Sequence, residues 1–231
     1  MSAPLFLSRW ETGTALHING MTRKDKMRLY FARHGESEAN VLKEFSNRPG
    51  KHGLTEKGKR QAEQLADNLK DIHFSALYCS PVLRAIQTAE IVANRLNMAY
   101  EIEDALREYD VGILEGKSDE ASWKRYWEVH VGWMEGRNRD VGIEGGESYN
   151  DIRERFLPFI GKLEEEYRAT EMNILLIGHG GTYRCMLPLL LSNVDHSVSL
   201  ASHVDYTTCV MAELRGREWV CVRWGEKVFE G

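Results

Sequence analysis

The chain has 231 residues and a mass of 26.5 kDa, which suits one large domain or one domain with an insertion. Hydrophobic residues make up 42% and charged residues 28%, a balance that supports a substantial core and excludes a disordered-type composition. A net charge of −5 argues against nucleic acid or an anionic membrane as the main partner, but it leaves room for a local basic pocket.

Residues 1–26 show no sustained hydrophobic period, so we predict an N-terminal extension followed by one domain over residues 27–231. No apolar stretch reaches the 18 or so residues of a membrane helix, and the first residues lack a basic, signal-like start. The four cysteines form no C-x-x-C pair, which favours a reducing compartment. We therefore expect a cytoplasmic protein.

From residue 27 onward, strand and helix patterns alternate. Residues 27–32 are predicted to form a buried strand, and residues 54–71 a helix capped by Thr55. Residues 75–80 predict a second strand. A helix should follow, with Ser80 as its cap and Pro81 at its first position.

The second half of the chain continues in the same way. Helices are predicted over 119–136 and 146–169, a strand over 172–179, a helix to 191, and a closing hairpin over 207–224. Strands separated by helices indicate the α/β class. We expect a three-layer α/β/α sandwich with a mainly parallel central sheet and a helical insertion, approximately residues 115–145, over the active site.

Three loops leave the predicted strands, and each carries residues suited to an anion. The first brings Arg33 and His34, the second brings Arg84 one helical turn later, and the third brings His179 and Gly180. Ligands of open α/β sheets bind at the carboxyl ends of the strands, where parallel strands would gather these loops. Guanidinium groups bind phosphate oxygens in pairs, and glycine lets the backbone approach closely. The sequence therefore predicts a site for a small polyanion.

A metal site is the competing use of two histidines. Arg33 and Arg84 beside them would repel a divalent cation, and no H-x-H, H-E-x-x-H or carboxylate cluster accompanies them. We predict no metal and no cofactor.

These residues stand in segments that resemble the histidine phosphatase superfamily, in its phosphoglycerate-mutase-like branch. The matching segments fall in family order and are "RHGES" with Asn40 downstream, "LTEKGKRQA", "SPVLRAIQTAEIVA", "LREYDVGILEGK", "GGES" and "LLIGHGG". The resemblance implies that His34 is the phosphorylated nucleophile and that no metal takes part. It also implies that Arg33, Arg84 and His179 bind the transferring phosphoryl group, with Asn40 in the phosphate pocket.

Glu108 matches the proton donor of that family, and Asp110 is a rival two residues further on. An acid at this point would protonate the leaving alkoxide, and its carboxylate would then activate water against the phosphohistidine.

The 70 residues between Glu108 and His179 are fewer than the resemblance implies for cofactor-dependent mutases. We therefore expect a metal-independent phosphomonoesterase acting on a small phosphorylated metabolite. A phosphoglycerate mutase is the alternative, with a phosphoprotein phosphatase or a non-catalytic binding module as further possibilities. A homodimer is possible.

The insertion carries aromatic residues at helical spacing, which we interpret as core packing rather than as a binding wall: Trp123, Tyr126, Trp127, His130 and Met134. Charged residues that could reach a second anionic group of the substrate are Arg48, Lys51, His52, Lys124, Arg125, Arg137 and Arg139. Asp205 and Thr207 are doubtful members of the pocket.

Overall fold

The computed structural model describes residues 27–167, 172–202 and 204–229. The predicted extension over residues 1–26 lies outside the described residues. The elements are, in chain order, β1 (Arg28–Arg33), α2 (Glu38–Leu42), α3 (Glu56–Leu69), β2 (Ala76–Cys79), α4 (Leu83–Leu96), β3 (Glu101–Ile102), the 3₁₀ turns η1 (Asp104–Leu106) and η2 (Gly112–Leu114), α5 (Glu120–Met134), α6 (Tyr149–Tyr167), β4 (Asn173–Gly178), α7 (Gly180–Leu190), α8 (His196–Ala201), β5 (Cys209–Arg215), β6 (Glu218–Trp224) and β7 (Lys227–Val228). Within these ranges, no helix combines the length and apolar character needed to cross a membrane.

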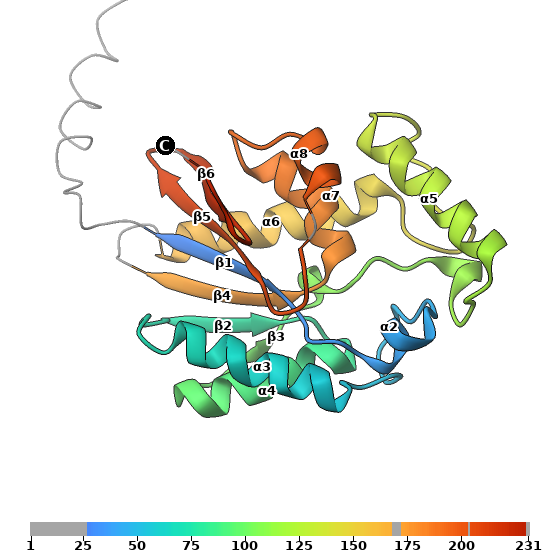
Figure 1. Ribbon diagram of the computed structural model, residues 1–231. Coiled ribbons are helices and arrows are strands. Elements are labelled where there is room, and N and C mark those ends of the chain that lie inside the picture. Colours follow the sequence, from blue (N-terminus) through green and yellow to red (C-terminus); the bar gives the residue numbers. More distant parts are fainter. Residues whose placement is uncertain (1–26, 168–171, 203, 230–231) are drawn as a thin grey trace, which may run out of the picture.

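One seven-stranded sheet organises the fold, with strand order β3-β2-β4-β1-β5-β6-β7 (Figure 1). The four strands from β3 to β1 are parallel, and β5, β6 and β7 continue the sheet antiparallel. The predicted hairpin is the β5–β6 pair, which turns at Gly216 with a φ of +66°. The predicted α/β fold with parallel strands at its centre is confirmed.

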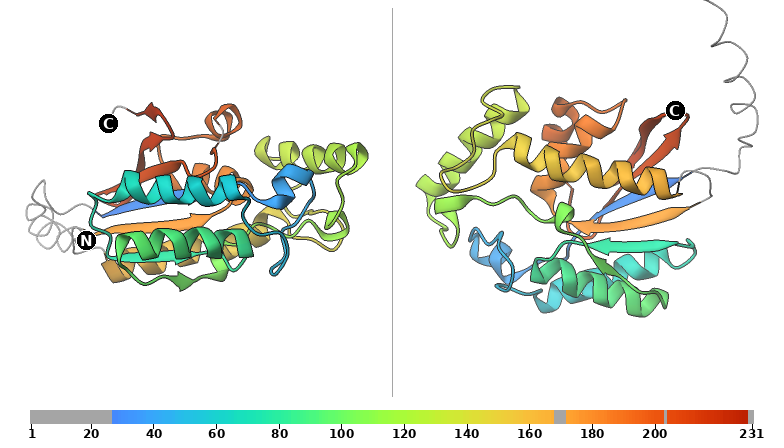
Figure 2. Two further views of the ribbon diagram at one scale, coloured as in Figure 1. Left: turned by 60° about the horizontal axis from the view of Figure 1, so that its bottom comes forward. Right: turned by 180° about the vertical axis from the view of Figure 1, so that it is seen from behind.

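Helices cover both faces of the sheet (Figure 1 and Figure 2). Side chains alternate along β1, so Leu29 and Phe31 enter the core under α6 and α7, whereas Tyr30 and Ala32 enter the core against α3 and α4. Burying one large apolar side chain contributes roughly 1.5–3 kcal/mol. A strand that is apolar on both faces is therefore held at the centre of the sandwich.

The two helices after the first loops begin differently from each other. Thr55 accepts a hydrogen bond from the Gly58 amide at 3.0 Å and caps α3, as predicted. The prediction for α4 is wrong, because this helix begins at Leu83 after Val82 rather than at Pro81. The Ser80 hydroxyl accepts from the Val82 amide at 3.2 Å and also lies 2.7 Å from Nε2 of His179, which keeps Ser80 at the strand end.

The loop after β1 packs directly on the first turn of α3. A Cβ atom at Gly58 would lie 1.9 Å from the Glu36 carbonyl oxygen, and one at Gly35 would lie 2.4 Å from the Gly58 carbonyl oxygen. Both positions therefore need glycine, and this contact fixes the path of the chain around His34.

The predicted insertion contains α5, which is capped by Asp119 through the Ser122 amide at 3.0 Å. This helix lies to one side of the sandwich, beyond the sheet edge at which β1 and β4 end (Figure 1).

Candidate active site

Three neighbouring parallel strands deliver the predicted residues to one sheet edge. Arg33 pairs with Gly178 at the ends of β1 and β4, so His34 and His179 follow at equivalent positions. Their ring centroids are 5.0 Å apart. Strand β2 ends beside β4, and the chain then carries Arg84 into the same place at the start of α4.

His34 is oriented by its own loop. Its Nδ1 lies 2.6 Å from the Gly35 carbonyl oxygen, which can only accept, so Nδ1 carries the hydrogen and Nε2 carries the lone pair. Burial, reinforced by Arg84 and Arg33, holds the pKa of His34 well below the ordinary value of 6.5. The ring is therefore neutral at physiological pH, as a nucleophile requires.

Arg84 connects the two histidines. Its Nε donates to Nε2 of His34 at 2.9 Å, one terminal nitrogen donates to the Ser46 carbonyl oxygen, and the other donates to Nδ1 of His179 at 3.2 Å. Burial lowers the pKa of Arg84 to about 10, so the guanidinium keeps its charge at neutral pH.

His179 lies directly behind this pair and is fully buried. Because Arg84 can only donate, Nδ1 of His179 accepts and Nε2 donates to the Ser80 hydroxyl. Burial, together with Arg84, keeps the pKa of His179 well below 6.5. A phosphoryl dianion alongside would favour the protonated ring, which could then donate to it.

Arg33 faces the same space from β1. Its guanidinium carbon lies 4.1 Å from the ring centroid of Tyr206, and one terminal nitrogen donates to the Val204 carbonyl oxygen at 3.1 Å. Its Nε is buried and has no hydrogen-bond partner among the described residues. A Cβ atom at Gly180 would lie 3.3 Å from this Nε, so glycine keeps the approach to it open. The Nε–H of Arg33 is therefore available to donate a hydrogen bond to an anionic oxygen in the cavity.

Glu108 reaches the site from the loop between η1 and η2. Its carboxylate accepts from the amides of Gly181 and Thr182 at 3.0 and 2.7 Å, and from the Thr182 hydroxyl at 2.8 Å. A Cβ atom at Gly181 would lie 2.8 Å from the carboxylate oxygens, so only glycine permits this contact. The first turn of α7 therefore holds the carboxylate through its free N–H groups.

The rival acid Asp110 points elsewhere. Its carboxylate pairs with Arg48 at 3.1 and 3.2 Å and accepts from the Gly112 amide at 2.7 Å. Asp110 does not line the cavity, whereas Glu108 does.

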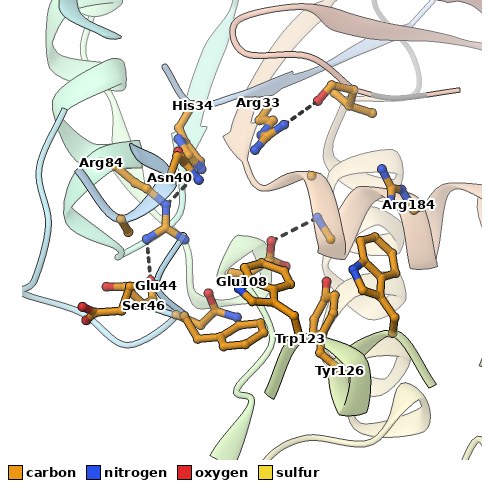
Figure 3. A pocket seen from close by; sticks show the side chains of 17 residues that line it. Arg33, His34, Asn40, Glu44, Ser46, Arg84, Glu108, Trp123, Tyr126 and Arg184 are labelled. Carbon is orange, nitrogen blue, oxygen red and sulfur yellow. Dashed lines mark hydrogen bonds between the residues drawn. The ribbon is translucent and has the colours of Figure 1, made fainter. Parts of the chain in front are cut away.

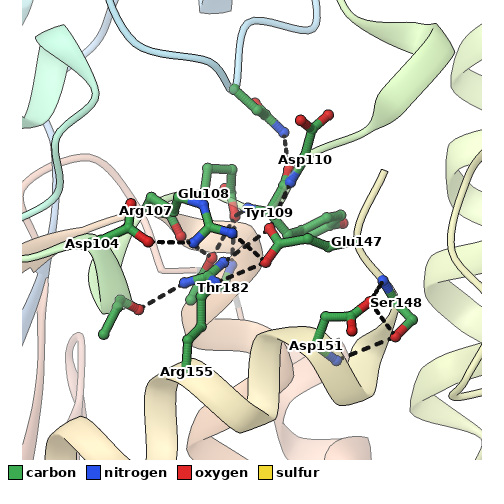
Figure 4. Close-up of polar contacts among 12 residues, drawn as sticks. Asp104, Arg107, Glu108, Tyr109, Asp110, Glu147, Ser148, Asp151, Arg155 and Thr182 are labelled. Carbon is green, nitrogen blue, oxygen red and sulfur yellow. Dashed lines mark hydrogen bonds and ion pairs between the residues drawn. The ribbon is translucent and has the colours of Figure 1, made fainter. Parts of the chain in front are cut away.

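A glutamate from the "GGES" segment braces the Glu108 loop (Figure 4). Glu147 accepts from Arg107 at 2.6 Å, from Nε of Arg155 at 2.9 Å and from the Asp110 amide at 2.9 Å. Side chains and backbone on both sides of Glu108 are thus tied to one carboxylate.

These residues surround a cavity of about 260 Å³ (Figure 3). Its walls include the predicted residues Arg33, His34, Asn40, Arg84, Glu108 and Gly180. Asn40 uses its side-chain oxygen to accept from the amide and hydroxyl of Ser37, at 3.1 and 2.9 Å. The structure therefore gathers the predicted set around one space, with His179 immediately behind it.

The interpretation of the insertion as core packing is correct for four of its residues and wrong for Trp127. His130 and Met134 are buried, and Trp123 and Tyr126 pack against the core while they also line the cavity. Trp127 lines the cavity and is 41% exposed. Helical spacing alone could not separate these roles, because one helix here faces both a core and a cavity. The charged residues that were expected to reach a second anionic group do not line this cavity; they are Arg48, Lys51, His52, Lys124, Arg125, Arg137 and Arg139.

Sequence reasoning missed Arg184 and Tyr206. Arg184 lines the cavity one helical turn into α7, and its guanidinium carbon is 5.8 Å from the ring centroid of Trp127. Its spacing of four residues from Gly180 was a usable signal, because it places both on one helix face. Tyr206 lies in an irregular loop, where no period exists to reveal it. Asp205 and Thr207 do not line the cavity.

Within the described ranges, no group of three or more histidine, cysteine or carboxylate side chains is arranged to hold a metal ion. Each of the four cysteines is a free thiol.

Comparison with known proteins assigns the family. The description "Histidine phosphatase superfamily (branch 1)" matches residues 29–227, and the chain belongs to this superfamily. It is 30% identical over 198 residues to "6-phosphofructo-2-kinase/fructose-2,6-bisphosphatase" of Caenorhabditis elegans, covering 84% of this chain and 40% of that protein. It is 31% identical over 167 residues to "Phosphoserine phosphatase 1" of Hydrogenobacter thermophilus, covering 71% and 76%. The chain spans only 32% to 40% of the kinase/bisphosphatase relatives.

Solved structures share the fold. A mycobacterial glucosyl-3-phosphoglycerate phosphatase complexed with VO3 gives a TM-score of 0.73 at 22% identity, covering 87% of this chain and 99% of the other. The alpha-ribazole phosphatase from Shigella flexneri gives 0.71 at 24% identity, covering 89% and 99%.

Proposed function

We propose that this protein is a phosphomonoesterase that hydrolyses a small phosphorylated metabolite through a phosphohistidine at His34. The observation that carries the proposal is the orientation of His34. Its Nδ1–H is fixed on a carbonyl oxygen, and its Nε2 lone pair lies beside Arg84 at the cavity wall. The family relationship and the phosphatases among the relatives support the same reaction class.

In the first half-reaction, Nε2 of His34 attacks phosphorus and the bond from phosphorus to the ester oxygen breaks. Arg84 and Arg33 stabilise the charge spread over the equatorial oxygens, and His179 assists once protonated. Glu108 gives its proton to the leaving oxygen, so the products are an alcohol and a phosphohistidine.

In the second half-reaction, the Glu108 carboxylate takes a proton from water. The hydroxide oxygen bonds to phosphorus, the bond from nitrogen to phosphorus breaks, and phosphate leaves. The amide donors of α7 suit this step, because they hold the Glu108 carboxylate at the cavity wall.

The cavity dimensions support a small substrate over a phosphoprotein. A volume of about 260 Å³ is just below the usual range for ligand pockets, roughly 300–1,000 Å³, and α5 forms one of its walls. We further propose that the reaction needs no metal, since Arg33 and Arg84 on the cavity wall can supply the positive charge that a metal ion supplies in other phosphoryl transfers. Cytoplasmic location and a homodimer stay predictions.

The test is metal-free hydrolysis combined with trapping of the intermediate. After exhaustive EDTA treatment the protein should release phosphate from small esters, and labelled ester should give an acid-labile, alkali-stable phosphoenzyme. His34→Ala should abolish both, and His73→Ala, an exposed histidine, should change neither. Labelling that persists in His34→Ala, or activity that returns only with added metal, would overturn the proposal. Rapid discharge of the label onto 3-phosphoglycerate, with slow loss to water, would identify the mutase alternative.

A further inference from the structure

His130 is a buried polar residue on α5 that the reaction as described does not use. It is 1% exposed, and its Nδ1 lies 3.0 Å from the hydroxyl oxygen of Tyr109. Its Nε2 is buried and has no hydrogen-bond partner in the described part of the chain. Burying a polar nitrogen in this way costs free energy that an apolar residue of similar size would avoid. The free-energy cost of burying the unpaired Nε2 of His130 beside the active site suggests that this histidine has a functional role.

Tyr109 directly follows the proposed acid Glu108. Its ring is 1% exposed, and a Cβ atom at Gly181 would lie 2.9 Å from its edge. The ring therefore fills the space between α5 and the first turn of α7, whose amides hold the Glu108 carboxylate. A shift of Tyr109 would move Glu108 or its donors.

The rings of Tyr109, Tyr126 and His130 lie nearly parallel. The interplanar angle is 1° between Tyr109 and Tyr126 and 14° between Tyr126 and His130, with centroids 6.0 and 5.6 Å apart. Tyr126 also lines the cavity, so this stack connects the cavity wall formed by α5 to Tyr109, the residue next to the proposed acid.

We propose that His130 is a positioning residue, which holds Tyr109 through their hydrogen bond and thereby sets the place of Glu108 at the leaving oxygen. The inference rests on the proposed function. It gives the insertion a second task, since α5 then both forms the wall for the leaving alcohol and positions the group that protonates it.

Leaving-group dependence tests this role, because a merely structural residue would affect all esters alike. His130→Phe keeps a ring and removes the hydrogen bond, whereas His130→Asn can keep a polar atom near Nδ1. In His130→Phe, kcat/KM for glycerol 3-phosphate should fall by about 10- to 100-fold, the scale of a misplacement near 1 Å. Nitrophenyl phosphate, whose leaving group hardly needs a proton, should lose at most about threefold.

The remaining variants complete the design. His130→Asn should recover most of the loss. Tyr109→Phe should show the same ester dependence as His130→Phe, and the double variant should lose little more than either single one. Met134→Ala is the matched control, since it removes a buried side chain of α5 and should lower stability without any ester dependence.

Equal losses on both esters in His130→Phe would overturn the inference, as would a His130→Asn variant no better than His130→Phe. Glu108→Gln separates the possible failures. If Glu108→Gln itself shows no ester dependence, the proposed acid is wrong. If it does and the His130 variants do not, only the role of His130 fails.

Discussion

The nitrogen that should attack phosphorus, Nε2 of His34, accepts a hydrogen bond from Arg84. The Nε–H of Arg84 donates to Nε2 of His34, and its other nitrogens are held by Ser46 and His179. For His34 to react, the Nε–H of Arg84 must release Nε2 of His34 and donate to a phosphoryl oxygen instead. The exchange is favourable because an anionic phosphoryl oxygen attracts the charged guanidinium more strongly than the neutral imidazole nitrogen does. The substrate itself thus frees the nucleophile.

Arg184 offers a second cationic contact on the cavity wall. In Figure 3 it lies on the far side of Glu108 from Arg84, where the alcohol part of the ester would extend. Glu44 also lines the cavity, but its charge is countered by Lys51, and Nε2 of His52 lies 3.0 Å from the same carboxylate. We therefore expect the preferred ester to carry a second acidic group near Arg184.

Arg184→Met should separate two esters that differ in that group. For 3-phosphoglycerate, kcat/KM should fall by about 10- to 100-fold, the worth of one or two charge-assisted hydrogen bonds. For glycerol 3-phosphate the loss should be much smaller. Arg125→Met, a change at an exposed position on α5, is the control and should alter neither ratio. Equal losses on both esters would contradict this specificity role.

At the scale of elements, the loop from η1 to η2 carries Glu108 without regular secondary structure, and the hydrogen bonds of Glu147 hold this loop in place. The Glu147 side chain is 12% exposed and Arg155 is 13% exposed, so the pair is largely shielded from water. Removal of one partner leaves a buried charge uncompensated, which is more harmful than the pair itself is stabilising.

Glu147→Ala should lower the free energy of unfolding by about 2–4 kcal/mol, because it removes the carboxylate partner of Arg155, leaves Arg107 with Asp104 alone, and frees the Asp110 amide. Urea denaturation measures the loss. Glu144→Ala changes an exposed glutamate of the same segment and should stay within about 0.5 kcal/mol of the parent protein. If Glu147→Ala lowers the free energy of unfolding no more than Glu144→Ala does, the hydrogen bonds and ion pairs of Glu147 do not stabilise the fold.

At the scale of the whole molecule, the sequence predicts what periodicity and chain order control. Apolar strands that end at His34 and His179 had to lie in the sheet, and parallel neighbours bring their ends together. The sequence offers no comparable rule for where a side chain in an irregular loop, such as Tyr206, will lie. Ser80 was predicted as a helix cap from local chemistry, but the helix begins only at Leu83, and the Ser80 hydroxyl contacts both the Val82 amide and His179, a tertiary contact that the local sequence does not reveal. The helical spacing of the aromatic residues on α5 predicted core packing, but it could not show that Trp123, Tyr126 and Trp127 also line the cavity, because that depends on which elements face the helix.

The stability of the whole fold should depend on pH through its buried histidines. Burial keeps the pKa of His34 and His179 well below 6.5, and lowers that of His130 to about 3. Below pH 6.5 the unfolded chain binds protons that the folded protein does not, so the free energy of unfolding must fall as the pH falls. Each such histidine contributes up to about 1.4 kcal/mol per pH unit between 6.5 and its folded pKa.

Urea denaturation between pH 8 and pH 5 tests this expectation, in a range where most carboxylates stay ionised. Stability should be nearly constant above pH 7 and should decline from pH 6.5 to pH 5. His130→Asn removes one titrating group and should reduce that slope by up to about 1.4 kcal/mol per pH unit, whatever its effect on stability at pH 8. His73→Gln, at an exposed position, should leave the slope as it is. An unchanged slope in His130→Asn would mean that His130 takes up its proton in the folded protein as readily as in the unfolded chain, and so is not held neutral by burial.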